Sequence, residues 1–178
     1  MNRNYVLAFD PSGNWFEGKG TTGWCLYDLK TNKVVKFGFI SASAYVSQVR
    51  YWDAHIDLID GLAGYKPILV IEGYRLYGDV ATAQINSQLE TPQLIGAIKY
   101  EAWQRGMPII TQTASEVKLR WKDETLIHKG VFEKDGNTIK LNGYPTSDHI
   151  RDAVRHAIHF ATYKNKKKGD NYEGEYQD

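Results

Sequence analysis

The chain has 178 residues, of which 42% are hydrophobic and 24% charged, and its 22 Lys and Arg against 21 Asp and Glu leave a formal charge of +1. These fractions are typical of a globular domain and exclude a disordered or collagen-like chain. The longest apolar runs stop at Asp10 and Glu72 after only a few residues, so neither a membrane span nor a secretory leader is expected. A single cysteine, Cys25, excludes an intramolecular disulfide and favours a reducing, cytoplasmic location.

The charge is unevenly distributed along the chain. Residues 169–178 carry four acidic residues and no Lys or Arg, so the rest of the chain carries +5. A lysine-rich run at 164–168 precedes this acidic end; such a run either contacts phosphates or forms a solvated helix end. We expect one domain over residues 1–164 and a charged, flexible tail over 165–178.

Apolar runs rich in β-branched and aromatic residues predict five strands, at 5–9, 23–28, 33–40, 67–72 and 108–112. A four-residue link joins the second run to the third and has the composition of a hairpin turn, so these strands should be antiparallel. Helical periodicity predicts helices at 44–62, at 82–105 with an interruption at Pro92, at 114–121 and from Thr146 or Ser147 onward, while 131–141 has the pattern of a small hairpin. This order predicts a mixed α/β sheet with helices on both faces.

Three carboxylates occupy comparable places in these predicted elements. Asp10 ends the first strand, Glu72 ends the fourth, and Asp152 lies in the first turns of the last helix. Strand ends in such sheets converge on one crevice, and carboxylates at close quarters need compensating cations such as Mg²⁺ or Mn²⁺. The alternative for each residue alone is that it caps a strand or solubilises a loop.

The last helix has two distinct stripes. One is apolar, and the other carries His149, Asp152, His156 and His159. Asp148 and His149 both share a face with Asp152, so either is a candidate fourth metal ligand; carboxylate suits Mg²⁺ better, and imidazole tolerates Mn²⁺. Taken singly, the histidines fit solvent-facing or hydrogen-bonded helix positions, and Asp148 fits a first helical turn.

Six short segments together resemble the RuvC-like Holliday-junction resolvases of the RNase H-like nuclease superfamily, in their bacteriophage-type form. The segments are LAFDPS at 7–12, TGW at 22–24, VIE at 70–72, LIGAI at 94–98, SEVK at 115–118 and HIRDA at 149–153. They cover most of the chain in the family's order. The resemblance implies an RNase H-like fold, with a mixed five-stranded sheet of strand order 3-2-1-4-5 in which strand 2 is antiparallel and helices cover both faces.

The resemblance also implies an activity, a crossover junction endodeoxyribonuclease that nicks branched DNA in pairs. Its metal-binding quartet maps onto Asp10, Glu72, His149 and Asp152, with Asp148 as the alternative fourth ligand. In the implied mechanism two Mg²⁺ ions about 4 Å apart, for which Mn²⁺ can substitute, activate a water. Asp10 bridges the ions, Glu72 and Asp152 each complete one site, and His149 lies near the water. Lys118 matches the family's basic catalytic residue near the scissile phosphate, although a solvent-exposed helix lysine explains it equally well.

The implied partners are four-way DNA junctions and a second copy of the chain, because paired nicks need two active sites. A candidate dimer interface is the helical region 94–103, with Ile95, Ile98, Ala102 and Trp103, although core packing is the simpler explanation for most of them. Candidate DNA-binding residues lie in predicted loops and in or near the predicted helix at 114–121: Trp15, Phe16, Lys19, Tyr74, Arg75, Tyr77, Lys118, Arg120 and Lys122. Two stretches differ from the family pattern: an insertion at 14–20, and the hairpin at 130–141.

Other functions fit parts of the sequence. One is another RNase H-like nuclease that acts on flaps, forks or RNA–DNA hybrids. A second is an actin-like or sugar-kinase-like phosphate-binding domain, because an Asp-x-Ser motif followed by Thr-Gly can hold a nucleotide, although 178 residues are too few for the two lobes of those folds. A third is a non-catalytic junction-binding protein, against which the three carboxylates argue.

Overall fold

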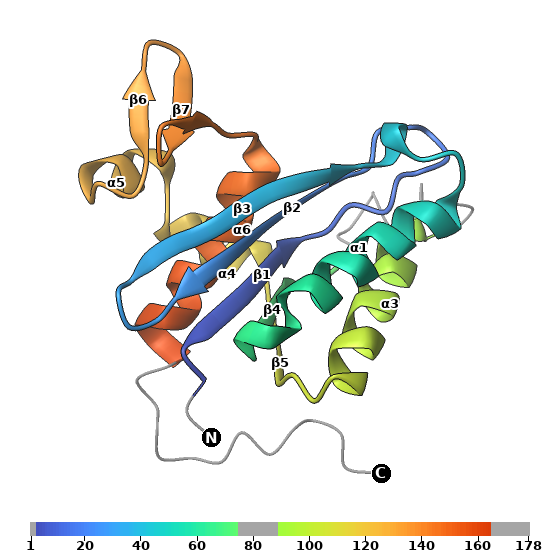
Figure 1. Ribbon diagram of the computed structural model, residues 1–178. Coiled ribbons are helices and arrows are strands. Elements are labelled where there is room, and N and C mark those ends of the chain that lie inside the picture. Colours follow the sequence, from blue (N-terminus) through green and yellow to red (C-terminus); the bar gives the residue numbers. More distant parts are fainter. Residues whose placement is uncertain (1–2, 75–88, 165–178) are drawn as a thin grey trace.

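A computed structural model describes residues 3–74 and 89–164 of the chain (Figure 1). Five strands form the main sheet: β1 (Tyr5–Asp10), β2 (Thr21–Asp28), β3 (Lys33–Ser41), β4 (Ile68–Glu72) and β5 (Ile109–Gln112). Their order is β3-β2-β1-β4-β5, with β1–β2 and β2–β3 antiparallel and β1–β4 and β4–β5 parallel. The predicted strand order and the antiparallel second strand are thereby confirmed.

The two central strands are buried on both faces, and their alternate residues serve two separate cores. In β1, Val6 and Ala8 point to one core while Leu7 and Phe9 point to the other, and the alternate residues of β4 divide in the same way. This two-residue period explains why β1 and β4 appear in the sequence as continuous apolar runs.

Helices cover both faces of the sheet (Figure 1). On one face lie α1 (Gln48–Leu62) and α3 (Glu90–Gln104), and on the other lie α4 (Ala114–Arg120) and α6 (Asp148–His159). The hydroxyls of Ser47, Thr113 and Ser147 accept backbone N–H groups at the starts of α1, α4 and α6. Such caps satisfy amides that otherwise lack a partner at a helix start.

Several predicted boundaries differ from the structure. The first helix begins at Gln48 rather than at 44, because Ala42–Ala44 form a short 3-10 turn, η1, and Ser47 caps the helix. A second 3-10 turn, η2 (Ala63–Tyr65), ends it, and a π-helical turn, η3 (Phe160–Lys164), follows α6. The predicted helical stretch 82–88 and the tail 165–178 lie outside the described residues.

The region between α4 and α6 contains more structure than the sequence predicted. A six-residue helix, α5 (Asp123–His128), was not predicted, because it is too short to show a clear period. The predicted hairpin is present as β6 (Glu133–Asp135) and β7 (Thr138–Leu141), and β8 (Tyr144–Pro145) adds a third strand beside β7. Figure 1 shows α5 and this small sheet near the start of α6, and Leu126, Phe132 and Leu141 belong to the core on that face of the main sheet.

The candidate dimer helix, α3, faces the core with most of its apolar residues. Ile95, Ile98 and Ala102 are buried, so the simpler explanation holds for these three. Tyr100 and Trp103 are exposed, and their rings stack 6.0 Å apart on the outer side of α3. Among the described residues, none of the helices is long and apolar enough to cross a membrane.

Candidate active site

The polar ends of three neighbouring strands point to the same face of the sheet. Even-numbered residues of β1 and β4 face α6, so the strand period directs Asp10 and Glu72 toward that helix. Phe9 is paired with Ile71, and Glu72 with Gln112 at the end of β5, so the three polar residues lie at successive strand ends. Open α/β sheets bind ligands at such strand ends.

Gly23 in β2 allows α6 to approach this edge closely. A Cβ atom at Gly23 would lie 2.1 Å from the backbone carbonyl of His149 and 2.5 Å from the amide nitrogen of Ile150. Only glycine therefore lets the first turn of α6 pack directly on the sheet. This contact sets the position from which His149 and Asp152 reach Asp10 and Glu72.

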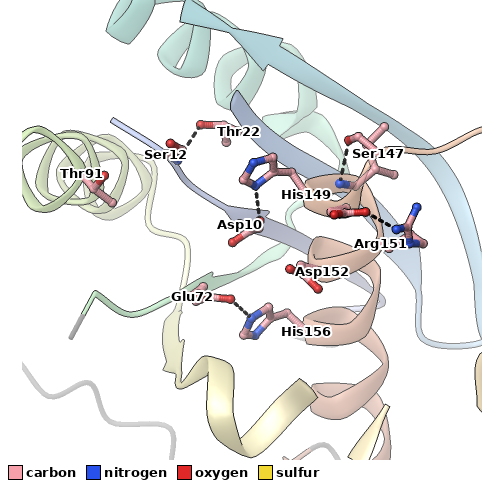
Figure 2. A network of polar contacts seen from close by, with 12 residues as sticks. Asp10, Ser12, Thr22, Glu72, Thr91, Ser147, His149, Arg151, Asp152 and His156 are labelled. Atoms are coloured by element: carbon pink, nitrogen blue, oxygen red, sulfur yellow. Dashed lines mark hydrogen bonds and ion pairs between the residues drawn. The ribbon is translucent and has the colours of Figure 1, made fainter. Parts of the chain in front are cut away.

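Three carboxylates gather between β1, β4 and α6 (Figure 2). Each has a nitrogen partner. Asp10 Oδ2 lies 2.6 Å from His149 Nδ1, and Glu72 Oε2 lies 2.8 Å from His156 Nε2. Lys118 Nζ lies 2.8 Å from Asp152 Oδ2 and 3.8 Å from Glu72 Oε2. The predicted residues Asp10, Glu72, His149, Asp152 and Lys118 thus come from four elements into one cluster.

Asp152 is held on its second oxygen as well. Arg155 bridges Asp152 Oδ1 and Asp123, and Asp123 also pairs with Arg151, whose Nε lies 3.2 Å away. Because both arginine side chains are largely buried, these ion pairs tie α5 to α6 more firmly than exposed pairs would. A cleft of about 360 Å³, lined in part by Lys118 and Lys122, opens beside this network.

The local charges shift the proton affinities of the cluster. Burial raises the pKa of Asp10, and so do the charges of Glu72 and Asp152, against the opposing hydrogen bond from His149. The hydrogen bond to Asp10 raises the pKa of His149 above its ordinary value. Burial alone would lower the pKa of Lys118, but the contact with Asp152 and the charges of Glu72 and Asp10 outweigh it and raise that pKa.

The donor types suit a hard divalent cation. Among residues 3–74 and 89–164, no three His, Cys, Asp or Glu side chains are already grouped as a metal site, and the Lys118 ammonium lies against two of the carboxylates. Within residues 3–74 and 89–164, the side-chain contacts to Asp10 and Glu72 each use one carboxylate oxygen, Oδ2 and Oε2, which leaves Oδ1 and Oε1 for a ligand. Oxygen donors and mutual repulsion are what Mg²⁺ or Mn²⁺ compensates.

The two candidates for the fourth ligand are placed differently. The Asp148 side chain is 84% exposed and pairs with Arg151, whereas His149 contacts Asp10. The geometry therefore brings His149, and not Asp148, to the carboxylates.

The predicted DNA-binding residues are spread around the cluster. Phe16 is 56% exposed and packs edge-on against the half-buried Trp15, whose Nε1 donates to the carbonyl of Tyr45. Lys19 is exposed and pairs with Glu17, and Tyr74 packs against the core beneath α1 and α3. Arg120 lies over the ring of Tyr163, and Lys122 is exposed before α5. Arg75 and Tyr77 lie outside the described residues.

Solvent-facing and hydrogen-bonded helix positions were the two alternatives for the α6 histidines. For two of them the structure shows the hydrogen-bonded one. His156 and His159 are buried and hydrogen-bonded, to Glu72 and to Glu116 respectively. No site role is predicted from the sequence for Gln112, Asp123 or Arg155. Two sequence signals could have indicated such roles. Gln112 ends the strand beside Glu72, and Arg155 lies three residues after Asp152, on the same side of the helix.

The backbone just after Asp10 is fixed from the opposite face of the sheet by a closed ring of hydrogen bonds. Ser12 N–H donates to Thr22 Oγ1 at 3.3 Å, and the Thr22 hydroxyl donates to His55 Nε2 at 2.8 Å. His55 Nδ1–H donates to the Tyr51 carbonyl at 2.7 Å, and the Tyr51 hydroxyl donates to the Ser12 carbonyl at 2.6 Å. Both carbonyls can only accept, and this requirement sets the direction of every proton in the ring.

Comparison with known proteins supports this architecture. No known protein-family model matches the sequence, and no curated protein matches it. The sheet order and the helices on both faces define an RNase H-like fold. The chain is similar to Thermus thermophilus RuvC solved with a Holliday junction substrate, with a TM-score of 0.66 and 15% identity over 92% of this chain and 96% of that one. A second Thermus thermophilus RuvC structure gives 0.61 and 16%, over 91% and 96%. The fold is therefore that of RuvC, and the bacteriophage-type assignment stays a prediction.

Proposed function

We propose that the protein is a metal-dependent endodeoxyribonuclease that resolves four-way DNA junctions by paired nicks. The observation that carries this proposal is the convergence of Asp10, Glu72 and Asp152 at one edge of a RuvC-like sheet, with His149 and Lys118 in contact with them. The Holliday junction in the related Thermus structure supports the choice of substrate class.

The chain's own residues have distinct tasks in this proposal. Asp10 Oδ1 and Glu72 Oε1, together with Asp152 and His149, would hold two Mg²⁺ or Mn²⁺ ions, which supply an activated water and stabilise charge on the phosphate. His149 Nδ1 donates to Asp10, so its Nε2 is the ring atom that would bind an ion. The Lys118 ammonium is 45% exposed and can turn toward a phosphate, where it would stabilise developing negative charge.

Paired nicking requires two copies of the site, and we propose a homodimer. The exposed, stacked pair Tyr100 and Trp103 on α3 is the part of the predicted interface that does not belong to the core. Light scattering of the wild type and of Trp103→Glu tests this: the wild type should be dimeric, and the variant should shift toward the monomer. A monomeric wild type would contradict the dimer.

The decisive experiment for the function is Asp10→Asn, assayed on a synthetic four-way junction. The substitution should abolish Mg²⁺-dependent cutting, because the neutral amide is a poor ligand for a hard cation, and it should leave junction binding largely intact. Asp57→Asn makes the same chemical change at an exposed position of α1 and serves as the matched control. Undiminished cutting by purified Asp10→Asn would refute the assignment.

The same assay separates the alternatives that remain open. Cleavage rates on a junction, a fork, an RNA–DNA hybrid and a linear duplex should be highest on the junction. A preference for the hybrid or the fork would assign the protein to another class of RNase H-like nuclease. His149→Gln should slow cutting far more than Asp148→Asn does, because only His149 contacts Asp10.

A further inference from the structure

His156 lies completely buried between two polar residues of neighbouring strands. Its Nε2 lies 2.8 Å from Glu72 Oε2, and its Nδ1 lies 2.8 Å from Gln112 Oε1. Gln112 is itself 1% exposed. Glu72 and Gln112 are paired across β4 and β5, so the imidazole from α6 spans two adjacent strand ends. Figure 2 shows its contact with Glu72.

The chemistry of these contacts fixes the ring from both sides. The carboxylate of Glu72 can only accept, so His156 Nε2 carries the hydrogen in that bond. Nδ1 faces the amide of Gln112, which can meet it with either of its ends. The ring therefore has no free rotation, and Glu72 Oε2 is committed to it.

The hydrogen bond to Glu72 Oε2 also fixes the direction of Glu72 Oε1. Both contacts to Glu72 among the described residues, from His156 and from Lys118, are made to Oε2. A carboxylate that is held at one oxygen presents the second in a fixed direction. Hydrogen-bonded residues behind a ligand are the usual means by which proteins prepare a ligand before the metal arrives.

We propose that His156, backed by Gln112, is a positioning residue that holds Glu72 with Oε1 ready to bind a divalent ion. This inference rests on the proposed function, since it concerns the same carboxylates. An apolar side chain of similar volume would fill this part of the core without the cost of burying polar atoms, so the choice of a histidine that contacts Glu72 supports a role at the site.

Two nearly isosteric variants separate the two contacts of the ring. In His156→Gln, the side-chain amide reaches the place of Nε2, so the donor to Glu72 is retained and the contact with Gln112 is lost. In His156→Asn, the shorter side chain reaches only the place of Nδ1, so the Gln112 contact is retained and Glu72 is released. Each variant buries one neutral amide, so each serves as the control for the other.

The measurement is Mn²⁺ binding by calorimetry, with thermal unfolding of the same metal-free samples. We expect His156→Asn to bind Mn²⁺ at least about tenfold more weakly than the wild type, and His156→Gln to lose clearly less. The two variants should unfold at similar temperatures. Equal Mn²⁺ affinities in the two variants would reduce His156 to a purely structural role and overturn the proposal.

The design also distinguishes this inference from the proposed function. A wild type that binds Mn²⁺ but does not cut junctions refutes the function, while the Asn and Gln comparison still decides the positioning role. A wild type that binds no divalent ion overturns both. If neither His156 variant folds, Gln112→Leu carries the test: it should weaken Mn²⁺ binding several-fold, and unchanged affinity would overturn the proposal.

Discussion

The two faces of the sheet use adjacent residues of β2 for opposite purposes. Thr22 points toward α1 and joins the neutral hydrogen-bonded ring with His55, whereas Gly23 lies under the first turn of α6. The first face holds the backbone after Asp10 in place, and the second brings the charged groups to it. A two-residue segment, TG, thereby fixes the site from both sides.

The histidines on the two faces show what this difference does. His55 is buried among neutral partners, and burial lowers its pKa to about 4. The pKa of His149 is raised instead, because its hydrogen bond to the Asp10 carboxylate favours the charged ring. The same residue type is thus held neutral where it supports the fold and is favoured in its charged form where chemistry is proposed.

The largest expected effect comes from breaking the close contact on the α6 face. Gly23→Ala places a methyl group against the His149 backbone, which cannot move without shifting α6, and we expect a loss of about 3 kcal/mol in the free energy of unfolding. Urea unfolding measures this. The control is Gly96→Ala on the exposed side of α3, where nothing lies within 4 Å; the better helix former should raise stability by up to about 1 kcal/mol. Unchanged stability of Gly23→Ala would contradict the direct packing of α6 on β2.

The next prediction concerns the α1 face of the sheet and the loss of stability that the buried His55 should cause at low pH. His55 has a folded-state pKa of about 4 against an ordinary value of 6.5, so between these values the unfolded state binds more protons. The contribution of neutral His55 to the free energy of unfolding is therefore complete above pH 6.5 and is lost as the pH falls toward 4. The loss over this range is about 3 kcal/mol. Urea unfolding across this range should show a steep decline for the wild type.

The comparison variant for this test is His55→Gln, which removes the titrating ring. It should be less stable than the wild type at neutral pH, because two buried hydrogen bonds are altered, and it should lose less stability on acidification. Parallel curves for the two proteins would show that His55 is not the source of the acid sensitivity.

The sequence predicted most of the main sheet because its central strands obey a simple rule. Uninterrupted apolar runs that end in Asp10 and Glu72 predicted buried strands with acidic ends, and the structure places both ends side by side on the face toward α6. The same two-residue period, extended to β5, would also have directed Gln112 toward α6. Helical periodicity correctly placed His149, Asp152 and His156 on one face of the last helix. It did not predict which residues of the sheet they contact.

What the sequence left open depends on contacts between distant segments. The roles of Thr22 and His55 arise from residues 33 positions apart, and that of Gly23 from a helix that begins more than a hundred residues later. Helix α5 has only six residues, and its place is set by the ion pairs of Asp123 with Arg151 and Arg155. Local secondary-structure propensity does not include any of these long-range contacts.

The smallest expected effect has the opposite sign and belongs to the charged face. Because the pKa of His149 is raised in the folded state, its protonation stabilises the fold below pH 6.5. This contribution to the free energy of unfolding is lost as the pH rises through the folded-state pKa. Because its side chain is 40% exposed, we expect less than about 1 kcal/mol. The difference in unfolding free energy between wild type and His149→Gln, measured in chelator, should shrink as the pH rises. In the Asp10→Asn background this pH dependence should become weaker, because the hydrogen bond and the charge of Asp10 are lost while the charges of Asp152 and Asp148 remain. Acid therefore weakens the protein through His55 while it strengthens the contact between His149 and Asp10, and a single pH series that resolves both signs separates the two faces of the sheet.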